Sequence, residues 1–167
     1  MNRRPLVALS TVLLLVALLA ASASVAVAKG AKILKFDAMV GVPAGLTGAQ
    51  SQAPLRGING GGVPWTIAAA SGDLRASGHL EITVKGLVLA SSGSNPSGTF
   101  RGLVSCVRSD GSFLNILTDP FPATTGPASA GGGNATIVAD VTLPEPCIAP
   151  IIFVTSAGGS WFAATGL

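Results

Sequence analysis

The sequence of 167 residues contains no tyrosine, one histidine and two cysteines. A single histidine, His79, excludes metal and catalytic sites that need two imidazoles, and it lies far along the chain from either cysteine, which argues against a zinc site. Tyrosine is the usual amphipathic contact residue of antibody-like binding surfaces, so its absence argues against a surface of that kind. We expect no metal and no cofactor.

The chain is also poor in charge. Charged residues make up 10% of it, whereas about 25% is average for a soluble domain. Eight basic and seven acidic residues follow residue 28, which leaves that part with a formal net charge of +1. These charges are scattered along the sequence. The distribution therefore excludes the basic stripe that nucleic-acid binding requires.

Residues 1–28 have the features of a secretory signal peptide. Arg3-Arg4 gives a positive start, residues 5–21 form an uncharged run, and Ala26-Val27-Ala28 matches the small-residue cleavage pattern. We predict cleavage after Ala28 and a secreted or extracytoplasmic location. The alternative is an uncleaved anchor, because about 20 apolar residues can span a bilayer as a helix.

After residue 28 the chain has neither a long apolar run nor a helical pattern. No stretch there reaches the 18 or more apolar residues of a membrane helix, so we expect no stable membrane insertion once the signal is removed. All 22 glycines and ten of the 11 prolines follow residue 28 and disfavour helix interiors. We predict that residues 29–167 form one all-β domain, an antiparallel β-sandwich of about nine strands, with a small β-barrel as the alternative.

The clearest strand signal is the alternation over residues 80–85, where Leu80, Ile82 and Val84 would face a core. Gly86 then interrupts the alternation and is interpreted as a bulge. Asn-Pro-Ser-Gly at 95–98 and Ser-Asp-Gly-Ser at 109–112 are turn signals. They predict a three-stranded meander in which residues 99–108 pair with 80–85 on one side and 113–117 on the other. Further strands are predicted at residues 31–40, 65–70, 73–77, 135–143, 148–155 and 160–165.

The two cysteines are Cys106, in a predicted strand, and Cys147, which follows Pro144-Glu145-Pro146. An even pair in an exported protein predicts a disulfide. The chain-entropy model gives a bridge of this span roughly 4 kcal/mol of stability. Because Cys106 shares strand parity with Phe100 and Val104, its sulfur should point toward the core.

Two long connections and three aromatic side chains are candidates for function. Residues 42–63 and 119–134 are rich in glycine and proline, and long loops in compact domains are either functional or mobile. Trp65, Trp161 and Phe162 could form a surface for a sugar or an apolar ligand. A small β domain more often buries such side chains in its core, and we favour that interpretation.

No motif identifies a reaction or a partner. The chain has no Gly-x-Ser-x-Gly elbow, and His79 is interpreted as an exposed structural residue at a strand edge. We expect a non-catalytic binding or structural module. The alternatives are a secreted hydrolase that uses loop carboxylates, and a β-barrel carrier of a small apolar ligand. Two or more acidic or hydroxyl groups converging in one cleft would favour the hydrolase, and an enclosed aliphatic cavity would favour the carrier.

Overall fold

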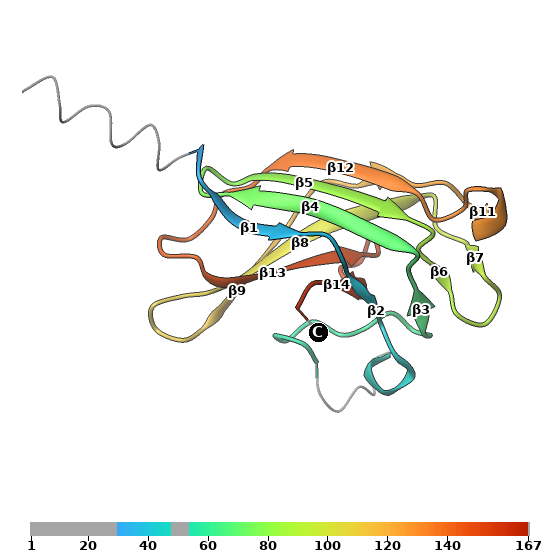
Figure 1. Cartoon of the computed structure of the whole chain (residues 1–167). Coiled ribbons are helices and arrows are strands. Elements are labelled where there is room, and N and C mark those ends of the chain that lie inside the picture. The colour runs from blue at the N-terminus through green and yellow to red at the C-terminus, as the bar shows by residue number, and fades with distance from the viewer. Residues whose placement is uncertain (1–29, 48–53, 167) are drawn as a thin grey trace, which may run out of the picture.

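The structure is a computed structural model and describes residues 30–47 and 54–166. Within these residues the chain forms fourteen β-strands and two short 3-10 helices, η1 (Ala44–Leu46) and η2 (Ala128–Ala130) (Figure 1). Six of the strands have only two residues. The all-β prediction is confirmed, and without the two-residue pieces eight strands remain, close to the expected nine.

A four-stranded antiparallel sheet has the order β1-β4-β5-β12. Its strands are β1 (Lys32–Phe36), β4 (Ala69–Arg75), β5 (His79–Lys85) and β12 (Ala135–Asp140). Burial alternates strictly along β5, where Leu80, Ile82 and Val84 are buried as predicted. This sheet therefore has one face toward the core and one toward solvent.

A six-stranded antiparallel sheet has the order β10-β8-β13-β14-β2, with β9 also paired to β8. Its strands are β2 (Val40–Gly41), β8 (Thr99–Val107), β9 (Phe113–Leu117), β10 (Phe121–Pro122), β13 (Ile148–Thr155) and β14 (Trp161–Ala164). Two small pairs, β3 (Trp65–Thr66) with β6 (Val88–Leu89) and β7 (Ser94–Asn95) with β11 (Gly126–Pro127), complete the fold.

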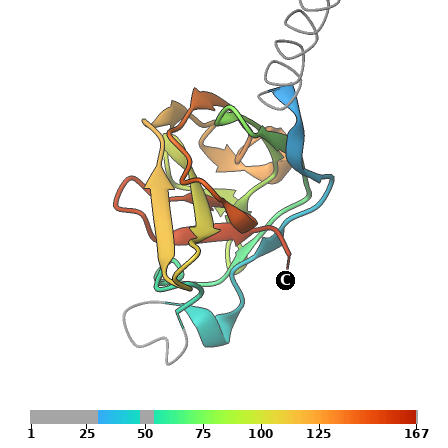
Figure 2. The same ribbon diagram turned by 90° about the vertical axis from the view of Figure 1, so that its left-hand side faces the viewer.

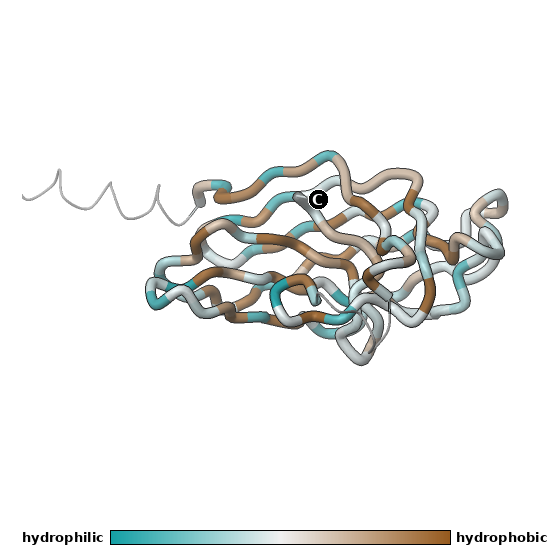
Figure 3. Tube along the Cα trace, turned by 90° about the horizontal axis from the view of Figure 1, so that it is seen from below, coloured by the Kyte–Doolittle hydropathy of each residue, from teal (hydrophilic) through white to brown (hydrophobic). Residues whose placement is uncertain are grey.

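The main core lies between these two sheets. A Cβ atom placed on Gly102 of β8 would lie 3.1 to 3.4 Å from side-chain atoms of Leu80, Ile82 and Ile137. Strand β8 therefore packs directly on β5 and β12, and the missing side chain allows the close approach. Seen as a hydropathy-coloured trace, apolar and polar residues alternate along the strands that enclose this core (Figure 3).

The predicted meander is half right. Strands β8 and β9 form the expected hairpin, in which Gly111 has φ 81° and the N–H of Arg108 donates to the carbonyl of Ser112 (Figure 2). The predicted pairing of 80–85 with 99–108 is wrong, because β5 pairs with β4 and β12 while the other neighbour of β8 is β13. Turn residues show that the chain reverses, but they do not show in which sheet the next strand lies.

Gly86 marks this change of sheet. We expected a bulge inside a continuing strand, but β5 ends at Lys85. Gly86 has φ 60°, and its N–H donates to the Oδ1 atom of Asn134 at 2.9 Å, so it leaves the ladder and turns the chain away. Residues 87–98 then cross to the other sheet through β6 and β7.

The barrel alternative is also wrong, because none of the sheets among the described residues is closed. The apolar-ligand carrier depended on that barrel. The predicted signal peptide, residues 1–28, and its cleavage point lie outside the described residues. No helix in the described part of the chain is long and apolar enough to cross a membrane.

Candidate binding site

The three aromatic candidates are core residues. Trp65, Trp161 and Phe162 are 5%, 0% and 8% exposed. The rings of Trp65 and Phe162 stack with centroids 4.0 Å apart, and both meet Phe100 edge-on. Trp161 packs edge-on against Phe153, so all three side chains are used in the core, which favours the core interpretation over a ligand surface.

Part of the first long connection covers the outer face of the six-stranded sheet. We call residues 54–61 the strap. The N–H of Trp161 donates to the carbonyl of Asn59 at 3.0 Å, and the N–H of Gly61 donates back to the carbonyl of Trp161 at 2.7 Å. In Figure 1 the strap lies below this sheet, on the side opposite the four-stranded sheet. The contacts give the connection a packing role.

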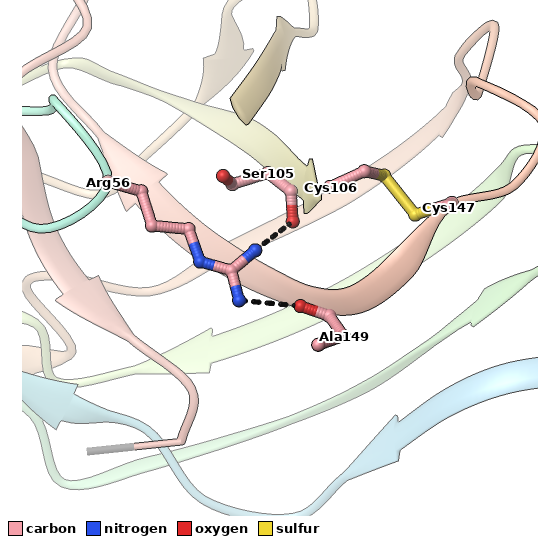
Figure 4. The surroundings of a disulfide bond; sticks show 5 residues. All are labelled: Arg56, Ser105, Cys106, Cys147 and Ala149. Carbon is pink, nitrogen blue, oxygen red and sulfur yellow. Dashed lines mark hydrogen bonds between the residues drawn. A yellow bond between two sulfur atoms is a disulfide. The ribbon is translucent and has the colours of Figure 1, made fainter. Parts of the chain in front are cut away.

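The strap is fastened beside the disulfide (Figure 4). Cys106 and Cys147 are joined as predicted, with Cα atoms 5.0 Å apart, and the half-cystine at 106 is fully buried. The guanidinium of Arg56 donates to the carbonyls of Ser105 at 3.1 Å and Ala149 at 2.7 Å. Burial lowers the pKa of Arg56, which nevertheless remains a cation. The arginine therefore ties the strap to β8 and β13.

The second long connection, 119–134, is also held by backbone bonds. It contains β10, β11 and η2, and the carbonyl of Asn134 accepts a hydrogen bond from the N–H of Thr124 at 2.9 Å. Gly132 and Gly133 approach neighbouring backbone so closely that a Cβ atom would collide. The glycines of this connection therefore serve close packing.

An open groove of about 600 Å³ lies at one end of the four-stranded sheet. Its lining is mostly apolar and includes both prolines of the Pro144-Glu145-Pro146 turn. Its charged lining consists of Asp140 and Glu145, and no lysine or arginine lines it. We call this the first groove, and its lining residues are Ile33, Ala76, Ser77, Asp140, Val141, Thr142, Leu143, Pro144, Glu145, Pro146 and Cys147.

A second groove of about 440 Å³ shares the segment 140–142 with the first. It runs between the end of β12 and the segment that includes β9 and β10. Its charged lining is again acidic, from Asp119 and Asp140. The lining residues are Ile116, Leu117, Thr118, Asp119, Phe121, Val138, Ala139, Asp140, Val141 and Thr142.

His79 holds Asp140 at the rim of both grooves. Its Nδ1 atom lies 2.9 Å from Oδ1 of Asp140, and its Nε2 atom lies 3.0 Å from Oε1 of Glu81. The hydrogen bond to Asp140, followed by the one to Glu81, raises the pKa of His79. The register places His79 directly opposite Asp140, so the sheet itself positions the pair.

This arrangement is poorly suited to acid–base catalysis. Both ring nitrogens of His79 contact carboxylates, and Ser77 Oγ accepts only from the backbone N–H of His79, at 3.4 Å, so no serine triad forms here. A carboxyl group that acts as a general acid at neutral pH needs a raised pKa. Two other carboxylates, Asp73 and Asp110, have lowered pKa values instead, Asp73 chiefly because Lys32 donates to it and Asp110 because Ser112 does.

Metal binding is not supported either. Within residues 30–47 and 54–166, no group of three or more histidine, cysteine, aspartate or glutamate side chains is arranged to hold a metal ion. The carboxylates of Glu81 and Asp140 contact opposite nitrogens of one ring, so they do not converge on a common point.

Sequence reasoning did not single out this site. Asp140 lies in the predicted strand 135–143 and Glu145 between the two prolines before Cys147, and no motif indicates a role for either. Their common groove depends on how the end of β12 packs beside residues 76–77 and 33, which no local pattern encodes. No protein-family model, curated protein or solved structure matches the chain.

Proposed function

We propose that this chain is an exported, non-catalytic binding module that takes a cationic, partly apolar segment of a partner into the grooves around Asp140. In this proposal residues 1–28 are the signal peptide and residues 29–167 form one domain. The disulfide supports export, because such bonds persist in oxidising compartments.

We also propose that the domain is a β-sandwich. Two open antiparallel sheets pack on a common core, with Gly102 of β8 against Leu80 and Ile82 of β5. Such a framework carries loops and strand ends rigidly, and binding sites on rigid scaffolds are commonly built from these parts.

The observation that carries the binding proposal is the composition of the first groove. Its volume of about 600 Å³ falls within the range of ligand sites. Apolar residues such as Leu143 and Pro146 line it, while Asp140 and Glu145 are the only charged groups in the lining. The complement of such a groove is an apolar group that carries a positive charge.

The test is binding of a synthetic heptapeptide of alternating lysine and valine, measured by calorimetry at low and high salt. The double variant Asp140→Asn/Glu145→Gln should weaken binding by about tenfold at low salt and flatten its salt dependence. Asp37→Asn is the matched control, because Asp37 is exposed and lines neither groove. Equal binding by the double variant and the wild type would contradict the proposal.

One observation favours a second candidate, the secreted hydrolase. Two carboxylates and two hydroxyls, those of Asp140, Glu145, Ser77 and Thr142, line the same groove. Against it, the side chain of Asp140 is 82% exposed and Glu145 is exposed as well. A panel of fluorogenic esters and glycosides tests this candidate, and turnover that disappears in Asp140→Asn/Glu145→Gln would favour it over simple binding.

A further inference from the structure

One edge of the four-stranded sheet has no strand beside it over half its length. Strand β12 is the last in the order β1-β4-β5-β12. Near its beginning the edge meets residue Ala123, which forms a bridge with Ala135. Over Val138–Asp140, no strand of the described chain pairs with the outer edge.

The register shows which backbone groups are free there. The N–H of Val141 donates to the carbonyl of Gly78, and in an antiparallel ladder the residues that bond to a given neighbour alternate. Ala139 and Ile137 therefore bond to Leu80 and Ile82 of β5. The N–H and C=O groups of Val138 and Asp140 point away from the sheet.

The second groove lies along this free edge. Its opposite wall comes from Ile116, Leu117 and Phe121 of the six-stranded sheet and its following turn. An extended chain in the groove could bond to the backbone of β12 and place alternate side chains on that apolar wall. This combination of a free edge and an adjacent apolar groove is the geometry of strand addition.

The charges of the groove select the occupant. Asp119 and Asp140 line it, and no lysine or arginine does. His79 and Glu81 of β5 lie beside Asp140 on the outer face, and Arg75 of the next strand is engaged with Asp73. A peptide with basic side chains meets carboxylates here, whereas an acidic one would be repelled.

We propose that an extended peptide segment of a partner, basic and with apolar side chains at alternate positions, adds to the four-stranded sheet as a new edge strand beside β12. This inference rests on the proposed function and names the mode by which the cationic segment is held. The bond between Asp140 and His79 then keeps the carboxylate at the rim where the basic side chain arrives.

The experiment removes one edge donor and leaves the sheet intact. Val138→Pro deletes an N–H that points outward, and proline is tolerated on edge strands. Val138→Thr is the matched control, because it keeps the N–H and the branched shape. With the lysine–valine heptapeptide as probe, Val138→Pro should weaken binding by about tenfold while Val138→Thr binds like the wild type.

A second measurement uses the wild-type protein alone. Addition of a strand should slow hydrogen exchange at the amides of Val138 and Asp140 when the heptapeptide is present, so the inference stays testable even if Val138→Pro fails to fold. A heptapeptide with proline in place of its central valine should give no such protection.

The outcomes separate the two proposals. If Asp140→Asn/Glu145→Gln weakens binding while Val138→Pro and the amide protection show no effect, charge recognition stands and strand addition is wrong. If the heptapeptide does not bind the wild type at all, both proposals fail. Equal protection by the proline-containing peptide would also overturn strand addition.

Discussion

The outer faces of the two main sheets differ in what covers them. On the four-stranded sheet, outward side chains such as Glu81 and Thr83 lie in solvent, and burial alternates along β5. On the six-stranded sheet, Leu103 and Phe153 also point outward, opposite one another in the register, yet both are buried. Strand β8 accordingly has a nearly continuous run of buried residues. The strap, which bonds to β8, β14 and the residues at the start of β13, lies on this outer face.

The exposed face has charged pairs where the covered face has packing. Lys32 Nζ donates to Asp73 Oδ2 at 2.8 Å, and Arg75 Nε lies 3.5 Å from Asp73 Oδ1. The bond from Lys32 is the main cause of the lowered pKa of Asp73. The side chains of Lys32 and Arg75 are 49% and 39% exposed, so each pair should contribute about 0 to 1 kcal/mol, whereas a buried aromatic side chain contributes several. Stability should therefore depend far more on the covered face.

The strongest test of this difference between the two outer faces is to truncate one side chain on each of them. Phe153→Ala removes a fully buried ring that packs edge-on against Trp161, and should lower the free energy of unfolding by about 3 to 5 kcal/mol. Thr83→Ala on the exposed face should change it by less than about 0.5 kcal/mol. Urea unfolding measures both, and similar losses would contradict the assignment of outer faces.

Loss of the disulfide should have the next largest effect on stability. It joins the end of β8 to the start of β13 within the covered sheet. Replacing Cys106 and Cys147 together with alanine should lower the free energy of unfolding by about 2 to 4 kcal/mol without changing the far-ultraviolet dichroism spectrum. Two free thiols in the unreduced wild type, detected by mass spectrometry, would contradict the bridge.

The contrast also explains what the sequence could and could not predict. The alternation around Leu80 predicts β5 because one face of that strand is exposed to solvent and the other is buried in the core. The Asp-Gly turn predicts the β8–β9 hairpin because its partners are neighbours in the chain. The strap is predicted only as a long connection, since its attachment depends on contacts such as that of Arg56 with Ala149, 93 positions away. The same holds for the pairing of β8 with β13.

Arg56 tests how firmly the strap is attached. Its guanidinium donates to two backbone carbonyls and lies 5.4 Å from the centre of the Phe113 ring. Arg56→Ala should cost about 1 to 3 kcal/mol through these lost contacts. Arg56→Lys keeps the positive charge but lacks the planar guanidinium that donates to two carbonyls at once. It should therefore recover only part of the lost stability. Hydrogen exchange at residues 54–61 should rise in both variants. Full recovery of stability in Arg56→Lys would contradict the role of the planar guanidinium.

The grooves lie at the border between the two kinds of face, where Asp140 ends β12. The sequence pattern places Asp140 in the strand 135–143 and indicates no role for it, because a carboxylate in a strand is ordinary on an exposed face. Its partner, His79, is 61 positions away and meets it only through the β5–β12 register. A candidate site of this kind depends on sheet pairing rather than on a motif.

The smallest effect should come from His79 on the exposed face, and its pH dependence has a definite sign. Asp140 and then Glu81 raise its folded pKa above the unfolded value of about 6.5. The stabilisation is therefore fully present below about pH 6.5 and is lost as the pH rises through the raised folded value. His79→Gln should lower the melting temperature more at about pH 5.5 than at about pH 8.5. Proton NMR of the single imidazole gives the pKa directly, and Asp140→Asn should lower it. An imidazole that titrates at or below the ordinary value would show that the two carboxylates do not hold it in solution.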